Sequence, residues 1–341
     1  KGTAMSKRTQ LKPTYLKDQF VIGHISYLRR GLWLQLAAAM LLIVVSVAGT
    51  SASRAWAEDT AKGLLGGPLQ ITSSGPVQIA HTSIGPPNGP PVLMIMGLTA
   101  SHRMWGEDLV GRLVAAGLRV ILFDNRDTGA SQRLDDMGQP LLWWNLLKWR
   151  IGLPVTKVYT LTDMATDAAA VLDAQGVKRA HVMGASMGGM IAQTFAVTYP
   201  ERTASLISIM STTNAPHLPP PSGEAEAGLR GVEESSGDRA QRLEEIGLYP
   251  SAMRRQLMAI LGAGDRTDQV AQIYAPTLVQ HGMEDTLLPL AHGEHTAATI
   301  PDAQFLSYAG MGHNLPKEIV PVLAADIVGH IIAHPIPAAE L

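Results

Sequence analysis

Ser186 is the residue of this 341-residue chain whose surroundings best suit covalent chemistry. It stands in Gly184-Ala-Ser-Met-Gly188, a G-x-S-x-G pattern between an expected strand, Ala180 to Met183, and an expected helix, Met187 to Tyr199. In that context the glycines permit a sharp turn that exposes the serine hydroxyl at a helix N-terminus. The pattern also arises by chance, so an inert serine in a glycine-rich turn is the alternative. A serine hydroxyl becomes a good nucleophile only when a base accepts its proton.

Two later loops offer a base and an acid to orient it. Asp285 follows one expected strand, and His313 follows the next, in a loop loosened by glycines. The carboxyl ends of parallel strands meet at one edge of a sheet, so we expect both side chains to reach Ser186. The sequence therefore predicts Ser186 as nucleophile, His313 as base and Asp285 as acid. Glu284 is the rival acid because it is adjacent and equally ionised, and His313 could instead be a surface histidine.

Backbone amides beside these residues could stabilise the negative charge of a tetrahedral intermediate. Met187 follows the nucleophile at the expected helix start, where the helix dipole strengthens its amide as a donor. The second donor should come from the loop after an earlier strand, and Leu98 is the best-placed residue there. Gly97 would let that loop approach closely, although it could be an ordinary turn glycine. His102 and Trp105 lie just beyond and could line a substrate pocket or simply contribute to the core.

Strands and helices alternate through the body of the chain. Short apolar runs predict buried strands, and apolar residues at helical spacing predict the helices between them. The expected strands are 92–96, 119–124, 180–183, 204–210, 277–280 and 304–308, and the expected helices are 161–176, 187–199, 291–300 and 319–332. This alternation is typical of an α/β fold, in which a mainly parallel sheet is covered by helices on both faces.

One long stretch interrupts the alternation between two expected strands. Residues 212–238 are rich in Pro, Gly, Ser and Glu, and residues 239–261 have the periodicity of an amphipathic helix. We interpret residues 212–268 as a short helical cap or lid over the site, and expect its acidic part to be a solvated, mobile face. Residues 58–211 and 269–341 then form the α/β core.

A second interruption is rich in tryptophan. Residues 141–151 contain Trp143, Trp144 and Trp149 among leucines. Aromatic and leucine side chains in a cluster most often belong to a hydrophobic core, which is our expectation here. The alternative is a substrate-facing or interfacial role.

The first 57 residues differ from the rest. Residues 1–30 carry seven Lys or Arg and one acid, and residues 31–53 carry no charge. With Ala55-Trp56-Ala57 behind them, they predict a secretory signal cleaved before Glu58, or an uncleaved membrane anchor through residues 31–53. Both place the remainder outside the cytoplasm, as a periplasmic, secreted or membrane-anchored protein. The alternative is a buried core helix.

Composition excludes several classes of function. The 27 basic and 29 acidic residues give a net charge of −2, which argues against nucleic acid as a partner. Without cysteine there is no disulfide, thiolate nucleophile or cysteine-built zinc site. His292, Glu294 and His295 lack the spacing of zinc motifs, and no glycine-rich phosphate loop is present, so we expect neither metal nor cofactor. Asp124 and Arg126 resemble a catalytic pair, but we interpret them as bracing a turn.

From about Gly66 to His330 the chain resembles the α/β-hydrolase superfamily, and within it the aclacinomycin methylesterase-like hydrolases. The order Ser186, Asp285, His313 is the nucleophile–acid–base order of that superfamily. The motifs that carry the resemblance are Ile95-Met-Gly-Leu98, Phe123-Asp-Asn-Arg-Asp-Thr-Gly129 with Ser131, Thr160-Leu-Thr-Asp-Met164, Gly184-Ala-Ser-Met-Gly-Gly-Met-Ile-Ala-Gln193, Ser208-Ile-Met-Ser211, His281-Gly282 and Gly310-Met-Gly-His-Asn-Leu-Pro316. This chain has Met96 where the wider superfamily commonly has histidine, and its cap looks short for a bulky polyketide substrate.

The resemblance implies a hydrolase fold, a serine nucleophile, small-molecule carboxylic ester substrates and no cofactor. Two other functions use the same scaffold. One is a cofactor-free perhydrolase or a carbon–carbon bond hydrolase with the same triad. The other is a non-catalytic binding protein, which the complete set of triad residues disfavours.

Overall fold

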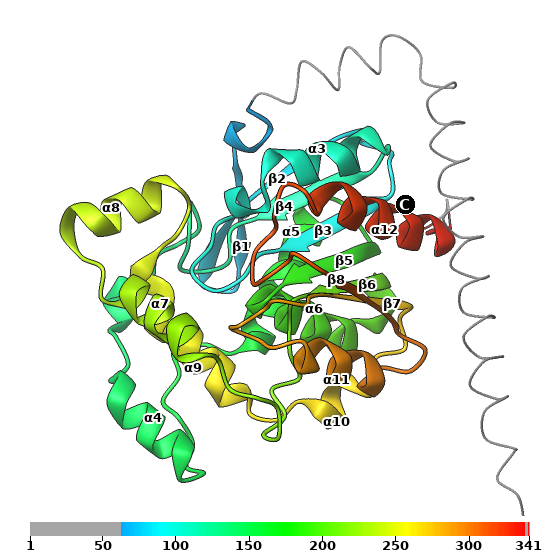
Figure 1. Ribbon diagram of the computed structural model, residues 1–341. Coiled ribbons are helices and arrows are strands. Elements are labelled where there is room, and N and C mark those ends of the chain that lie inside the picture. The colour runs from blue at the N-terminus through cyan, green and yellow to red at the C-terminus, as the bar shows by residue number, and fades with distance from the viewer. Residues whose placement is uncertain (1–62, 338–339, 341) are drawn as a thin grey trace, which may run out of the picture. The chain divides into compact units, whose positions relative to one another are not determined.

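The computed structural model in Figure 1 describes residues 63–337 and residue 340, and shows one eight-stranded sheet with the strand order β1-β2-β4-β3-β5-β6-β7-β8. The strands are β1 (Gln70–Ser74), β2 (Val77–Ile84), β3 (Pro91–Ile95), β4 (Arg119–Phe123), β5 (Ala180–Ala185), β6 (Thr203–Ile209), β7 (Thr277–Gly282) and β8 (Gln304–Tyr308). β2 pairs antiparallel with β1 and β4, and every pair from β4 to β8 is parallel. The predicted mainly parallel sheet is confirmed, and the antiparallel β1–β2 hairpin is an addition to it.

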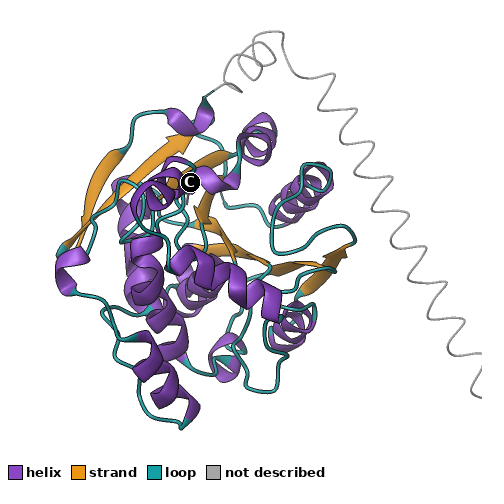
Figure 2. Cartoon of the chain, turned by 60° about the vertical axis from the view of Figure 1, so that its left-hand side comes forward, coloured by secondary structure: helices purple, strands orange, loops and turns teal. Residues whose placement is uncertain are grey.

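Helices cover both faces of this sheet (Figure 2). Their bounds are α3 (Glu107–Ala115), α4 (Leu142–Arg150), α5 (Leu161–Ala174), α6 (Met187–Thr198), α7 (Gly223–Glu233), α8 (Gly237–Glu245), α9 (Met253–Ala263), α10 (Thr267–Val270), α11 (Ala291–Thr299) and α12 (Val320–Ala333). Successive side chains of a strand point to opposite faces. Leu93 and Ile95 of β3 therefore pack in the core beneath α5 and α6, whereas Val92 and Met94 pack in the core beneath α3 and α12. These two apolar layers hold the sheet rigid below its carboxyl edge.

The cap segment, residues 212–268, is more helical than its composition indicated. Its acidic part, expected to be a solvated face, forms α7, which begins where the Ser222 hydroxyl accepts a hydrogen bond from the Ala225 amide at 3.1 Å. The helical character expected of residues 239–261 is divided between two helices. The structure has α8 and α9 there, separated by Gly247 at φ 99° and by a proline-initiated turn at Pro250.

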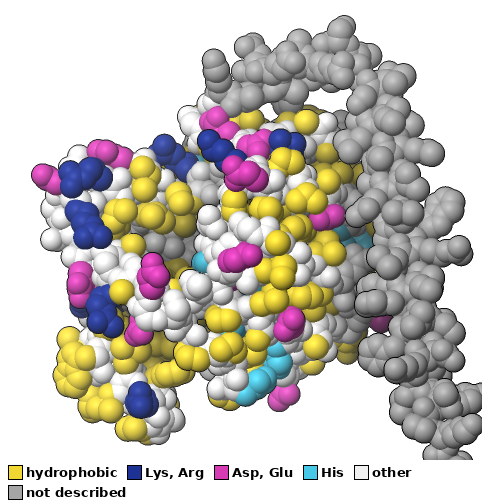
Figure 3. Space-filling view, viewed as in Figure 1, with side chains coloured by type: hydrophobic (Ala, Val, Ile, Leu, Met, Phe, Trp, Pro, Cys, Tyr) yellow, Lys and Arg dark blue, Asp and Glu magenta, His cyan; other side chains and the backbone are white. Residues whose placement is uncertain are grey.

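The expectation that the tryptophan cluster lies in the hydrophobic core is wrong. Trp143, Trp144 and Trp149 belong to α4 and are 67%, 43% and 49% exposed. In Figure 3, yellow apolar side chains gather on the lower-left lobe of the molecule, where Figure 1 places α4. A hydrophobic run in a sequence does not reveal which of its faces the neighbouring chain covers.

The expected export signal or anchor lies in residues 1–57, outside the described residues. Among the residues that the structure describes, no helix combines the length and apolar character needed to cross a membrane.

Candidate active site

Ser186 occupies a strained turn between β5 and α6. Its backbone lies at φ 56° and ψ −121°, a region that non-glycine residues rarely adopt. The turn closes so tightly that a Cβ on Gly184 would lie 2.1 Å from the Gly188 carbonyl oxygen, and one on Gly188 would lie 2.0 Å from that of Ile95. Only glycine therefore fits at both positions of the G-x-S-x-G pattern. The strain aims the serine side chain at the carboxyl edge of the sheet.

His313 joins Ser186 to Asp285. Its Nε2 lies 2.9 Å from Ser186 Oγ, and its Nδ1 lies 2.7 Å from Asp285 Oδ2. The three residues come from loops that follow β5, β7 and β8, parallel strands of the same sheet with β6 between β5 and β7. The structure thus brings together, in hydrogen-bonding order, the three residues that the sequence predicted as a triad.

Asp285 is fixed as a carboxylate by its surroundings. Its side chain is fully buried, and its Oδ1 accepts the Leu287 and Leu288 amides at 2.9 and 2.8 Å. Burial alone would raise the pKa of Asp285. Hydrogen bonds to His281 and His313 and the Leu288 amide outweigh that effect and hold its pKa below the ordinary range. An ionised Asp285 accepts Nδ1–H from His313 and leaves Nε2 facing the serine.

The rival acid, Glu284, points away from this arrangement. Its side chain is exposed, and its backbone amide donates to the Met311 carbonyl at 3.0 Å. Asp285, one residue later, turns inward. His281 reaches Asp285 as well, with Nε2 3.4 Å from Oδ2 and 2.7 Å from the Leu288 carbonyl. Sequence reasoning missed that contact, although the i, i+4 spacing of the two residues could have suggested it.

The expected oxyanion loop lies against the nucleophile. A Cβ on Gly97 would lie 3.1 Å from the Ser186 Cβ, so the loop after β3 passes directly beside the serine. Leu98 follows in that loop, and Met187 is the first residue of α6. Across residues 63–337, no protein acceptor is recorded for the amide of Leu98 or of Met187. Both amides are thus free to donate to a substrate oxygen.

The cap segment holds this loop in place. Thr99, at φ 61°, donates its amide to Gln256 Oε1 at 2.6 Å, and its carbonyl accepts the Tyr249 amide at 2.8 Å. The Ser101 amide donates to the Gly247 carbonyl at 2.8 Å. Gln256 is fully buried on α9, so its side chain is a fixed acceptor. Nothing in the sequence pattern pointed to this role for Gln256.

The pocket role expected of His102 and Trp105 is not supported. Both nitrogens of the His102 ring are engaged, with Nδ1 2.7 Å from Asp124 Oδ1 and Nε2 3.2 Å from the Leu65 carbonyl. Trp105 is 2% exposed and packs in the apolar layer beside α3. Gly97, the third expected pocket residue, does border the nucleophile.

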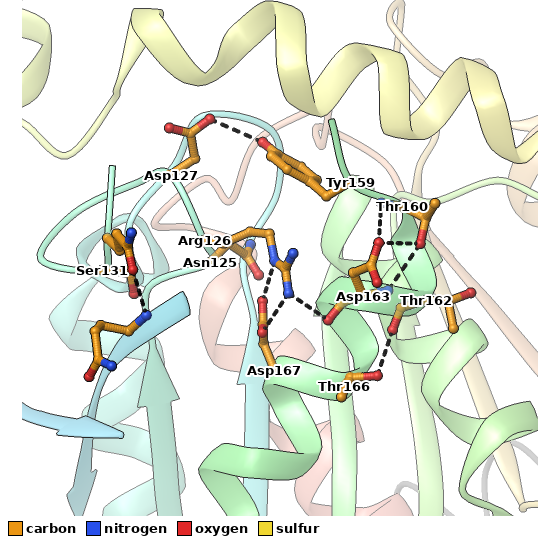
Figure 4. Close-up of polar contacts among 12 residues, drawn as sticks. Asn125, Arg126, Asp127, Ser131, Tyr159, Thr160, Thr162, Asp163, Thr166 and Asp167 are labelled. Atoms are coloured by element: carbon orange, nitrogen blue, oxygen red, sulfur yellow. Dashed lines mark hydrogen bonds and ion pairs between the residues drawn. The ribbon is translucent and has the colours of Figure 1, made fainter. Parts of the chain in front are cut away.

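Asp124 and Arg126 brace the turn after β4, as interpreted from the sequence. Asp124 Oδ2 accepts the Ala130 amide at 2.8 Å. Figure 4 shows the Arg126 guanidinium directed at Asp167, which it contacts at 2.7 and 2.8 Å. A cleft of about 300 Å³ beside Arg126 and Tyr159 includes none of the three triad residues.

The histidines weighed as metal ligands are engaged elsewhere. His292 Nδ1 lies 2.8 Å from Thr212 Oγ1, and its Nε2 lies 2.9 Å from the Pro219 carbonyl. His295 Nδ1 lies 2.9 Å from Thr213 Oγ1. Within the described part of the chain, no three acidic or histidine side chains are grouped to hold a metal ion.

The fold and the strand–turn–helix at Ser186 define the class. A family model described as the alpha/beta hydrolase fold matches residues 90–230, and the eight-stranded, mainly parallel sheet has that fold. The fold inferred from the sequence and the resemblance to α/β-hydrolases are thereby confirmed.

The relatives lie in the branch that the sequence resembles. The rhodomycin D methylesterase DauP of Streptomyces sp. (strain C5) is 29% identical over 309 residues, which cover 77% of this chain and 98% of DauP. The rhodomycin D methylesterase DnrP of Streptomyces peucetius is 28% identical over 312 residues, with the same two coverages. The crystal structure of the esterase RhEst1 from Rhodococcus sp. ECU1013 covers 78% of this chain and 99% of its own at a TM-score of 0.60 and 20% identity, a likeness that shows the fold.

Proposed function

We propose that this protein is a serine hydrolase that cleaves carboxylic esters through an acyl-enzyme intermediate. The observation that carries the proposal is the continuous hydrogen-bond chain from Asp285 through His313 to Ser186. The methylesterase relatives support a carboxylic ester as the substrate class. The sequence similarity to those relatives extends over 77% of this chain rather than over one motif.

Ser186, His313 and Asp285 each have a defined task in this mechanism. Ser186 Oγ attacks the ester carbonyl carbon while His313 Nε2 accepts its proton. The Asp285 carboxylate stabilises the resulting imidazolium, and the Leu98 and Met187 amides donate to the new oxyanion. His313 then donates the proton to the departing alcohol oxygen, which leaves Ser186 acylated. A water molecule, deprotonated by His313, attacks the acyl carbon, and Ser186 regains its proton as the acid leaves.

A panel of p-nitrophenyl esters with acyl chains of increasing length tests the proposal. We expect hydrolysis with a burst of p-nitrophenol equal to the enzyme concentration wherever deacylation is slower than acylation. The same protein is also assayed for peracid formation with peroxide and acetate, and for hydrolysis of a substrate with a cleavable carbon–carbon bond. Peracid formation or carbon–carbon cleavage without ester hydrolysis would assign the triad to another reaction. Ligand binding without any turnover would indicate a non-catalytic protein.

Gln256 should act as a positioning residue for the oxyanion loop. Gln256→Met keeps the side-chain length but removes the acceptor for the Thr99 amide. We expect kcat to fall about tenfold or more, with KM within about twofold, because the displaced donor acts mainly on the transition state. The measurement is steady-state kinetics on one ester, with a thermal melt to verify folding.

Gln272→Met is the matched control, since Gln272 is exposed and its side chain donates to the nearby Asp268 carbonyl, away from the triad and the oxyanion loop. Its kinetics should equal those of the unmodified protein. A folded Gln256→Met variant with an unchanged kcat would show that the cap does not position the loop for catalysis.

A further inference from the structure

Helix α4 reverses the usual arrangement of a surface helix, in which apolar side chains face inward and polar ones face water. Its one buried residue is polar: Asn145 is 1% exposed. The Asn145 amide nitrogen donates to the Leu141 carbonyl at 2.9 Å, and its oxygen accepts the Thr156 amide at 2.7 Å. The bond to Thr156 fastens the helix to the returning chain through its polar face. The apolar side chains are thereby held outward.

The outward side chains form a continuous group, which we call the α4 apolar face. Its large apolar members are 40–67% exposed: Leu141, Trp143, Trp144, Leu146, Leu147, Trp149, Ile151 and Leu153. Figure 3 shows yellow side chains gathered on the lower-left lobe, where Figure 1 places α4. A contiguous apolar patch exposed on a folded protein marks a binding surface rather than chance composition.

All charged residues of the segment that carries this face have the same sign. From residue 139 to residue 162 the sequence contains Lys148, Arg150 and Lys157 and no acidic residue, although the whole chain carries a net charge of −2. Arg150 and Lys157 are exposed. The Lys148 ammonium lies 5.7 Å from the Trp144 ring and 3.1 Å from Thr156 Oγ1. The partner of this surface must therefore accept apolar side chains and also carry negative charge.

A lipid surface with anionic headgroups meets both requirements. Tryptophan rings settle at the boundary between headgroups and acyl chains, and lysine and arginine attract anionic lipids. A nine-residue helix is far too short to span a bilayer but long enough to lie in its interface. A second copy fits less well, because a symmetric contact through this face would bring the same cations together. We propose that the α4 apolar face binds the surface of a membrane that contains anionic lipids.

The absence of cysteine allows a site-specific test on the full chain. Leu147→Cys carries an environment-sensitive nitrobenzoxadiazole label on the α4 apolar face. Tyr274→Cys carries the same label at a site that is 84% exposed, in the loop before β7. Vesicles of phosphatidylcholine with phosphatidylglycerol should shift the emission at residue 147 to the blue and leave residue 274 unchanged. Because the readout is local, attachment of the chain through any other segment does not imitate it.

Charge reversal tests the anionic requirement. Arg150→Glu should raise the lipid concentration needed for the response at residue 147 about tenfold or more, because it replaces an attraction to anionic headgroups by a repulsion. Arg230→Glu, an exposed substitution on α7, is the matched control and should leave the response unchanged. Vesicles of phosphatidylcholine alone should give a much weaker response.

Three results would overturn the proposal. The first is an emission at residue 147 that vesicles do not change. The second is an emission at residue 147 that is already shifted to the blue in buffer without vesicles. A shift that grows with protein concentration would assign the face to a second copy, and a shift independent of concentration would assign it to another part of the same chain. The third is an equal response to neutral and anionic vesicles that Arg150→Glu leaves intact.

Discussion

Replacing Ser186 by alanine should lower ester turnover by about a thousandfold or more without altering the fold. The strained backbone of the turn is imposed by close contacts of Gly184 and Gly188 with neighbouring backbone, and the serine hydroxyl takes no part in those contacts. The Ser186 hydroxyl is hydrogen-bonded to His313 Nε2. The variant therefore loses the nucleophile and keeps the turn. The measurement is kcat on a p-nitrophenyl ester together with the melting temperature.

Ser73→Ala is the matched control, because Ser73 is exposed and contacts Gln78 on the β1–β2 hairpin. His313→Ala should lose turnover to a similar extent, since an unactivated hydroxyl is a weak nucleophile. Retention of more than about a tenth of the turnover by folded Ser186→Ala would mean that another group performs the attack, because triads act as a unit.

The two adjacent acids provide an internal comparison. Asp285→Asn should lower kcat by about 10³ to 10⁴, since an amide no longer fixes the His313 tautomer or stabilises its imidazolium. Glu284→Gln should have little effect, because that side chain is exposed. The opposite ranking would transfer the role of the acid to Glu284.

The carboxyl edge of the sheet could be predicted because local signals mark it. A G-x-S-x-G pattern after a strand indicates where a serine turns outward, and Asp285 and His313 follow their strands with polar and glycine-rich loops. Parallel pairing of β5, β6, β7 and β8 then brings these loop starts to one edge. The same reasoning left Asp285 and Glu284 as alternatives, because the direction of a loop side chain depends on contacts such as the Leu287 and Leu288 amides.

Other parts of the site depend on contacts between residues 128 or more positions apart in the sequence. Gln256 meets Thr99 across 157 residues, and Arg255 meets Asp127 across 128 residues. Neither pair has a spacing or motif that distinguishes it from surface polar residues. The orientation of α4 could not be predicted for the same reason, because it depends on the hydrogen bond between Asn145 and the Thr156 amide outside the helix. Side chains that join separate segments can be recognised only when the folded structure shows which segments lie together.

The Arg255–Asp127 ion pair is the contact between the cap segment and the core whose loss should cost most stability. Both side chains are fully buried, and Arg255 Nε and Nη2 lie 2.5 and 2.8 Å from the Asp127 carboxylate. Nη2 also donates to Asp135 at 2.7 Å, and Nη1 to the Gly138 carbonyl at 3.1 Å. Burial alone would lower the pKa of Arg255, but its bonds to the two aspartates raise it above the ordinary value. Arg255 is therefore always charged, and it neutralises the buried Asp127 carboxylate.

Arg255→Met should lower the free energy of unfolding by about 3–5 kcal/mol, because it leaves the Asp127 carboxylate buried without a counter-charge. For a domain of this size that corresponds to a fall in melting temperature of roughly 10 °C. Activity below the melting temperature should also fall, since Gln256, the next residue on α9, holds the oxyanion loop. Arg112→Met is the control: Arg112 forms an exposed i, i+4 pair with Asp108, and its loss should cost less than about 1 kcal/mol.

Removing the carboxylate charge in the same variant separates a charge effect from a loss of side-chain contacts. The double variant Asp127→Asn with Arg255→Met should lose less free energy of unfolding than the sum of the losses in the two single variants. The reason is that the double variant buries no unpaired charge. The Asn side chain still accepts the Leu134 amide, which bonds to Asp127 Oδ1 at 3.0 Å, and so keeps the turn after β4 closed. Strictly additive losses across this double-mutant cycle would show that Arg255 stabilises the fold through its apolar stem and not through Asp127.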